Sequence, residues 1–176
     1  KRFLTDYDIK IATNYDELYL DIETDDTIPL TDPKLLAERR ILSVAWELHY
    51  IDKTRAPDVG FLLLKDETDR SERQLLHEFA DVIEQADVLY AWNGNNFDFP
   101  ILRKRARKFG VAIQWEHLAT IDLLRTWFRY FQRGATVNTS FALQNIAKRV
   151  LKQDKIDWKL RAAARGLTLK RFVELY

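Results

Sequence analysis

The chain has 176 residues, of which 47% are hydrophobic and 12% aromatic, and this composition is sufficient for one domain with a buried core. It contains no Cys and only three His, which excludes disulfides, a thiolate metal site and a Cys nucleophile, and argues against a zinc centre. The apolar runs are too short to span a membrane and no signal peptide is visible, so we expect a soluble intracellular protein, cytoplasmic, nucleoid-associated or viral.

The formal net charge is only +1, but the charges are divided unevenly along the chain. Residues 1–88 carry 11 Lys and Arg against 21 Asp and Glu, whereas residues 89–176 carry 17 against 6. An acidic half with clustered carboxylates and a basic half suit a metal-dependent enzyme that acts on a polyanion. Halves of a sequence need not be halves of a structure, so this pattern supports that interpretation without deciding it.

The first predicted element is a strand over residues 18–23, in which apolar and polar residues alternate. Alternation places Asp21 and Glu23 on the same face, side by side near the end of the strand. Two adjacent carboxylates repel each other unless a cation lies between them, and oxygen ligands suit a hard divalent ion. The alternative is an edge strand with two solvated acids.

Further elements follow in chain order from periodicity and punctuation. Apolar runs predict strands over 40–48 and 59–64, and together with the first strand these suggest an antiparallel meander. A capping box formed by Ser71 and Gln74 predicts the start of a helix that continues to residue 86. The other predicted elements are strands over 88–92 and 119–121 and helices over 100–109, 123–132, 140–151 and 168–176.

A second acidic motif, Asn93-Gly94-Asn95-Asn96-Phe97-Asp98, follows the predicted strand over 88–92 and opens a helix. A strand–helix–strand sequence implies a crossover and a parallel neighbour. Open α/β sheets place ligands beyond the carboxyl ends of their parallel strands. If this strand lies beside the first, Asp98 comes close to Asp21 and Glu23, and three converging carboxylates would hold two metal ions.

These motifs resemble those of a known family. Asp21-Ile22-Glu23-Thr24 resembles the first motif of the DEDD-type 3′→5′ exonucleases, and Asn93-x-x-x-Phe97-Asp98 resembles the second, in the form found in proofreading domains of family-B DNA polymerases. The resemblance covers most of the chain from about Leu18 onward. It continues through residues 120–123, 139–143 and 155–158.

The resemblance implies a ribonuclease H-like α/β fold, with a mixed five-stranded sheet (an antiparallel meander plus parallel strands) flanked by helices. It implies hydrolysis of phosphodiester bonds at the 3′ ends of single-stranded DNA, by two Mg²⁺ or Mn²⁺ ions roughly 3.5–4 Å apart. Asp21 would bridge the ions, Glu23 would orient the attacking water, and Asp98 would hold the second ion.

Other site residues are also implied by the resemblance. Thr24, Asn93 and Phe97 match positions that touch the terminal nucleotides. Phe97 could stack on a base or pack as a core residue beneath the helix, and the sequence leaves both readings open. Lys155 matches a lysine that assists with phosphate charge, although one solvated Lys among many is the simpler reading.

The chain departs from the family at the third motif, Tyr-x-x-x-Asp, which supplies a fourth carboxylate. Tyr130 is followed four residues later by Gly134, and Tyr176 is the last residue. We therefore expect residues 1–176 to form a single exonuclease-like domain, a fragment that ends before the third motif and is impaired in catalysis. The pair His117/Asp122 fits a sister group's motif but precedes the expected helix, so Asp122 instead suggests a cleft residue or a helix cap.

Two functions of different class remain open. The first is an exonuclease domain, with a polymerase domain in the same parent chain as a possible partner and RNA not excluded as substrate. The second is a catalytically inactive nucleic-acid-binding or scaffolding domain on the same fold. The basic run over residues 103–108 could contact a nucleic-acid backbone, but such a run is more often a solvated helix face.

Overall fold

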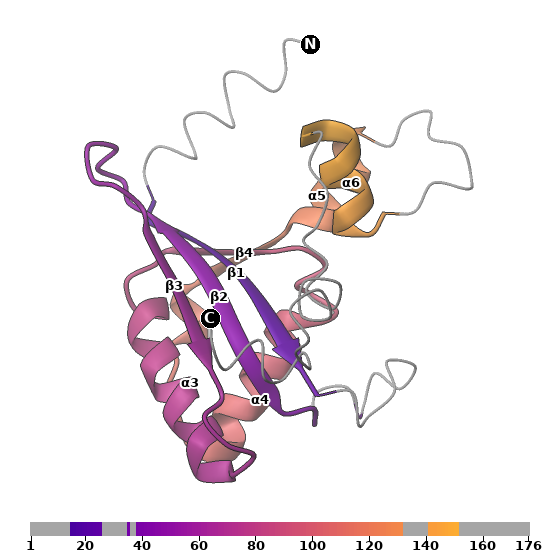
Figure 1. Ribbon diagram of the computed structural model, residues 1–176. Helices are drawn as coiled ribbons and strands as arrows, with labels where there is room; N and C mark the ends of the chain where they lie inside the picture. The colour runs from indigo at the N-terminus through magenta and orange to yellow at the C-terminus, as the bar shows by residue number, and fades with distance from the viewer. Residues whose placement is uncertain (1–14, 26–34, 36–37, 132–140, 152–176) are drawn as a thin grey trace, which may run out of the picture. The chain divides into compact units, whose positions relative to one another are not determined.

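The structure is a computed structural model that describes residues 15–25, 35, 38–131 and 141–151 (Figure 1). The chain divides into two units, residues 1–133 and residues 134–176. The first unit contains the sheet and most of the helices, whereas the described part of the second contains α6 (Leu143–Leu151). Lys155 and the predicted helix over 168–176 lie outside the described residues.

The first unit is built on a mixed five-stranded sheet with the strand order β3-β2-β1-β4-β5. The central strand β1 (Glu17–Thr24) pairs antiparallel with β2 (Ile41–His49), which pairs antiparallel with β3 (Asp58–Leu63). On its other side β1 pairs parallel with β4 (Val88–Ala91), which pairs parallel with β5 (Ala119–Asp122). The predicted meander and the predicted parallel strands are both confirmed.

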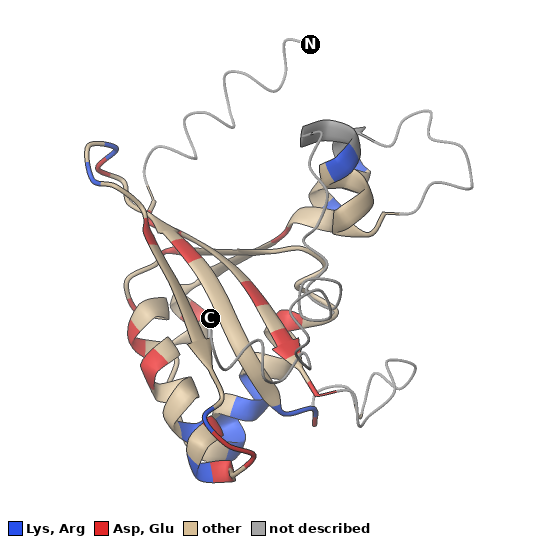
Figure 2. Ribbon diagram, viewed as in Figure 1, with Lys and Arg blue, Asp and Glu red and all other residues tan. Residues whose placement is uncertain are grey.

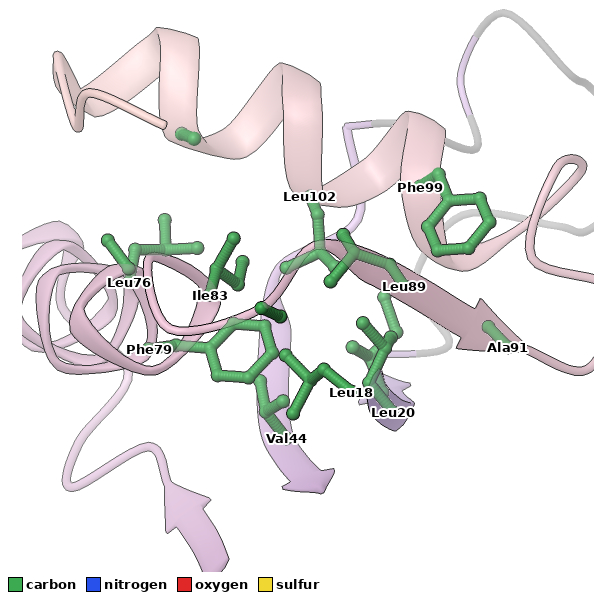
Figure 3. Close-up of a cluster of buried hydrophobic side chains, with 14 of the residues drawn as sticks. Leu18, Leu20, Val44, Leu76, Phe79, Ile83, Leu89, Ala91, Phe99 and Leu102 are labelled. Atoms are coloured by element: carbon green, nitrogen blue, oxygen red, sulfur yellow. The ribbon is translucent and has the colours of Figure 1, made fainter. Parts of the chain in front are cut away.

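The alternation in β1 separates two faces of the sheet. Leu18, Leu20 and Ile22 are all buried, whereas Asp21 and Glu23 are exposed on the opposite face. Two helices, α3 and α4, supply the apolar side chains that complete the core on the buried face (Figure 3). The most deeply buried members of this core are Leu18, Ile41, Val44, Leu76, Phe79, Leu89, Ile101 and Leu102.

The helix α3 (Asp69–Ile83) begins earlier than the sequence suggested. Its N-cap is Thr68, whose side chain accepts a hydrogen bond of 3.1 Å from the backbone N–H of Ser71. The Ser71 hydroxyl oxygen instead accepts from the backbone N–H groups of Lys65 and Asp66. The predicted capping box at Ser71 was therefore wrong, because this hydroxyl is used to close the turn before the helix.

The helix α4 (Asp98–Phe109) ends as predicted at Gly110, which adopts a left-handed conformation with φ of 66°. Glycine carries no steric penalty in this conformation, which is why it commonly terminates helices. The apolar side of α4 is buried through Phe99, Ile101 and Leu102. This packing fixes the start of the helix, and with it Asp98, against the sheet.

The basic run on α4 is used largely within the protein. Arg105 is buried, and its guanidinium donates to both carboxylate oxygens of the fully buried Glu72 of α3. Lys104 forms an ion pair with Glu38, and Lys108 with Asp69. These pairs favour the interpretation of the run as a structural helix face over that of a nucleic-acid contact.

Short elements complete the described chain. A single 3₁₀ turn (Trp115–His117) precedes β5, and α5 (Leu123–Phe131) follows it directly. Within the described residues, none of the helices combines the length and the apolar character that crossing a membrane would require.

Candidate active site

The sheet brings the second acidic motif to β1. The strand β4 runs parallel to β1, so its carboxyl end points the same way, and a short loop then leads to Asp98 at the start of α4. The pairing of β1 with β4 extends only to Tyr19 and Tyr90. Beyond that point the backbone N–H of Ile22 donates a hydrogen bond of 3.2 Å to the Oδ1 of Asp98. The Asp98 carboxyl thus lies against the edge of β1, between Asp21 and Glu23 in the sequence.

The environment of Asp98 disfavours its negative charge. Its side chain is only 1% exposed. Burial, and secondarily repulsion from the carboxylate of Asp21, raise the pKa of Asp98 to about 7, with a smaller contribution from Asp122. The hydrogen bond from Ile22 lowers the pKa but does not compensate for these effects. Asp21 and Asp98 are therefore electrostatic neighbours, as the sequence predicted.

The acids of β1 lie at its carboxyl end, on the exposed face. Figure 2 shows acidic segments at this end of β1 and at the start of α4. Thr24, the last residue of the strand, is half-buried, and its hydroxyl accepts a hydrogen bond of 3.3 Å from Nη1 of Arg39. Arg39 is itself buried. Sequence reasoning missed this arginine, although its position just before β2, the antiparallel partner of β1, could have indicated it.

The residues present fit a hard divalent cation at this place. Asp21 and Asp98 offer carboxylate oxygens, the ligands that Mg²⁺ and Mn²⁺ prefer. Their mutual repulsion raises the pKa of Asp98, and a cation between them would relieve it. Within the part of the chain that the structure describes, however, no group of three or more His, Asp or Glu side chains is arranged to hold a metal ion. The position of Glu23 as a third ligand stays a prediction.

The loop between β4 and α4 carries the two other predicted substrate residues. Asn93 has a left-handed backbone with φ of 63°, and its side-chain oxygen accepts a hydrogen bond of 2.8 Å from the Asn96 amide. Phe97 is half-buried and packs against the core. Both expected roles of Phe97 thus remain compatible with its position.

Asp122 lies at the end of β5, next to Ala91 of β4, and is 4% exposed. Its Oδ1 accepts hydrogen bonds from the backbone N–H groups of Leu124 and Arg125, which caps α5. Its two oxygens also accept from the N–H groups of Asn93 and Asn95. The cap interpretation of Asp122 therefore holds, and the carboxylate is already committed to backbone donors.

The alternative motif formed by His117 and Asp122 does not come together. His117 is exposed and lies before β5, whereas Asp122 is buried at the far end of that strand. Residues five apart along an extended chain are separated by roughly 16 Å at about 3.3 Å per residue. The two side chains therefore do not form a common site.

Together the fold and the site define a class: an α/β domain whose central strand carries two exposed acids, with a third, buried acid at its edge. Comparison with known families agrees with this class. The sequence profile of the RNase H superfamily matches residues 18–163, and the chain belongs to that superfamily.

Curated proteins with partial similarity are archaeal DNA polymerases. The chain is 39% identical over 44 residues to a DNA polymerase of Methanocaldococcus jannaschii, which is 25% of this chain and 3% of that protein. It is 44% identical over 45 residues to DNA polymerase 1 of Pyrococcus abyssi, covering 24% of this chain and 6% of the polymerase. The DNA polymerase of Thermococcus litoralis is 42% identical over 45 residues, 24% of this chain and 3% of that protein. The matched stretches are thus a small part of each polymerase.

Proposed function

We propose that this chain is a metal-dependent 3′→5′ exonuclease domain that hydrolyses phosphodiester bonds at the 3′ ends of single-stranded DNA. The observation that carries the proposal is the buried Asp98 carboxyl, held against the edge of β1 by the N–H of Ile22 and repelled by Asp21. Membership of the RNase H superfamily and the partial similarity to DNA polymerases support a nuclease-type domain in a polymerase context.

Asp21, Glu23 and Asp98 would hold two divalent ions, Mg²⁺ or Mn²⁺. When bound, such ions lower the pKa of water and neutralise charge at the scissile phosphate. The chain itself supplies orientation, because the Ile22 N–H fixes Oδ1 of Asp98. Asp98 also releases its proton when the site is filled, since its pKa of about 7 leaves much of it protonated at neutral pH.

Thr24, Asn93 and Phe97 surround this position and would contact the terminal nucleotides. The hydroxyl of Thr24 is oriented by Arg39, whose buried guanidinium also places a positive charge next to the acids. Phe97 is only half-buried, so part of its ring is open for a base, a contact worth about 1–3 kcal/mol in single-strand binders. Lys155 would assist with phosphate charge.

The test combines metal binding with degradation of labelled single-stranded DNA. We expect the chain to bind Mn²⁺ in a calorimetric titration and to shorten 5′-labelled DNA progressively from its 3′ end. Asp21→Asn and Asp98→Asn should weaken both. Asp16→Asn is the matched control, because Asp16 is a half-buried carboxylate at the opposite end of β1, where it accepts from the N–H of Ile51.

Each failure in this test has a separate meaning. Equal Mn²⁺ affinity in the wild type, Asp21→Asn and Asp98→Asn would remove the metal site from the proposal. Binding of DNA and Mn²⁺ without hydrolysis would instead support a non-catalytic nucleic-acid-binding domain. A parallel reaction with RNA of the same sequence decides which of the two nucleic acids is preferred.

A further inference from the structure

The carboxylate of Asp122 joins two segments that are separate in the sequence. Through Oδ1 it caps α5 at Leu124 and Arg125, with hydrogen bonds of 3.0 and 3.3 Å. It also accepts from the N–H of Asn93 to Oδ1 at 3.1 Å and from the N–H of Asn95 to Oδ2 at 3.2 Å. A helix cap requires only the first two of these bonds. The other two bind the loop that leads to Asp98.

This loop is tightly constrained. Asn93 holds a left-handed backbone with φ of 63°, and its carbonyl oxygen accepts from the N–H groups of both Asn96 and Phe97. A Cβ at Gly94 would lie 2.6 Å from the ring of Phe99, so the backbone packs directly on the first turn of α4. A left-handed non-glycine residue persists only where the surroundings over-determine it. Asp122 supplies two of the bonds that do so.

We propose that Asp122 is a positioning residue, which holds the backbone of Asn93 and Asn95 so that α4 starts where the Asp98 carboxyl meets the N–H of Ile22. The inference deepens the proposed function, because Asp98 is a metal ligand only under that proposal. Asp122 does not itself touch metal or substrate. It acts through the loop, in the way that outer partners orient metal ligands.

The substitution Asp122→Asn separates the two roles of the carboxylate. The remaining carbonyl oxygen of Asn can still cap α5, since Asn is as good an N-cap as Asp. The new amide group donates hydrogen bonds and cannot accept one, so at least one N–H of the loop loses its partner. Asp16→Asn again serves as the control, because it alters a carboxylate that accepts from the backbone N–H of Ile51.

Two measurements test the proposal. The first is amide hydrogen exchange of Ile22 in the metal-free protein, which reports the bond to Asp98. We expect exchange at Ile22 to be at least about tenfold faster in Asp122→Asn and unchanged in Asp16→Asn. The second is Mn²⁺ affinity, which we expect to fall about 10–100-fold in Asp122→Asn, the usual loss when an outer partner of a metal ligand is removed.

The outcomes distinguish this inference from the proposed function. If Asp122→Asn leaves both the exchange of Ile22 and the Mn²⁺ affinity as in wild type, Asp122 is only a helix cap. If the wild type binds no Mn²⁺, the proposed function fails, while the exchange of Ile22 still decides the positioning role. Should Asp122→Asn not fold, Asp122→Ser gives the same test, because Ser caps a helix but is too short to reach the loop.

Discussion

The backbone N–H of Ile22 donates a hydrogen bond of 3.2 Å to Oδ1 of Asp98, 76 residues further along the chain. Ile22 separates the two exposed acids of β1, so this one bond brings the third acid to them. It holds a carboxyl that is 1% exposed, in a position where Asp21 repels it. Such stored repulsion is typical of sites that await a charged ligand.

The first prediction concerns the pH dependence of stability. The pKa of Asp98 is raised from 3.8 to about 7 in the folded protein, so the folded state binds a proton more tightly than the unfolded state. Stability is therefore highest below about pH 4 with respect to this group, falls as the pH rises towards 7, and stays reduced above it. In metal-free protein Asp98→Asn removes this penalty, on the order of 4 kcal/mol at pH 8.

The measurement is urea unfolding of wild type and Asp98→Asn in the presence of a chelator, at pH 5 and at pH 8. We expect the variant to gain more stability relative to wild type at pH 8 than at pH 5. The Asp16→Asn variant should show no such difference between the two pH values. A gain that is equal at both pH values would mean that Asp98 titrates normally.

The second prediction concerns the buried ion pair that joins α3 and α4. Glu72 is fully buried, and its Oε1 accepts from Nε of Arg105 at 2.7 Å and from the N–H of Ile41 at 3.0 Å. Arg105→Met would leave this carboxylate without its charged partner, and we expect a loss of about 3–5 kcal/mol in the free energy of unfolding.

The control for this pair is Lys104→Met on the same helix. Lys104 and Glu38 form an ion pair with side chains 43% and 44% exposed, and such exposed pairs contribute about 0–1 kcal/mol. Chemical denaturation measures both variants. A loss of less than about 1 kcal/mol in Arg105→Met would mean that Glu72 is stabilised by other groups.

Much of the site could be predicted from local pattern. Alternation along β1 placed Asp21 and Glu23 on one face, and the strand–loop–helix pattern placed Asp98 at the carboxyl end of β4. These predictions succeed because burial imposes period 2 on a strand and because parallel strands share their carboxyl edge. Gly110 was predictable for the same local reason, since it ends a helix in a left-handed conformation.

Other features could not be predicted, because a partner distant in sequence decides them. Glu72 and Arg105 are 33 residues apart, and each alone suggests a solvated position on its helix. Thr68 and Ser71 are both suitable N-caps, and only the turn at Lys65 and Asp66 shows which hydroxyl is already occupied. The bond between Arg39 and Thr24 depends likewise on the register of β1 with β2.

The third prediction concerns the left-handed backbone of Asn93. Asn93→Gly should change the free energy of unfolding by less than about 0.5 kcal/mol, because Gly adopts a φ of 63° freely. Asn93→Ala should cost about 1–2 kcal/mol, because its Cβ is disfavoured there. Both variants lose the side-chain bond to Asn96, so their difference isolates the backbone effect. Equal stability of the two in thermal unfolding would mean that the loop relaxes to a negative φ.

The last prediction links metal binding to protonation and rests on the proposed function. A carboxyl must be ionised to bind a cation, so filling the site releases the proton that Asp98 holds below its pKa of about 7. We expect Mn²⁺ affinity to be nearly constant above pH 7.5 and to fall by up to about tenfold per pH unit below 7. Calorimetric titrations from pH 5.5 to 8.0, repeated in buffers of different ionisation enthalpy, measure the affinity and the protons released. In Asp98→Asn this component of the pH dependence should disappear along with much of the affinity. A wild-type affinity that is flat down to pH 5.5, without proton release, would show that the cation does not bind the Asp98 carboxyl.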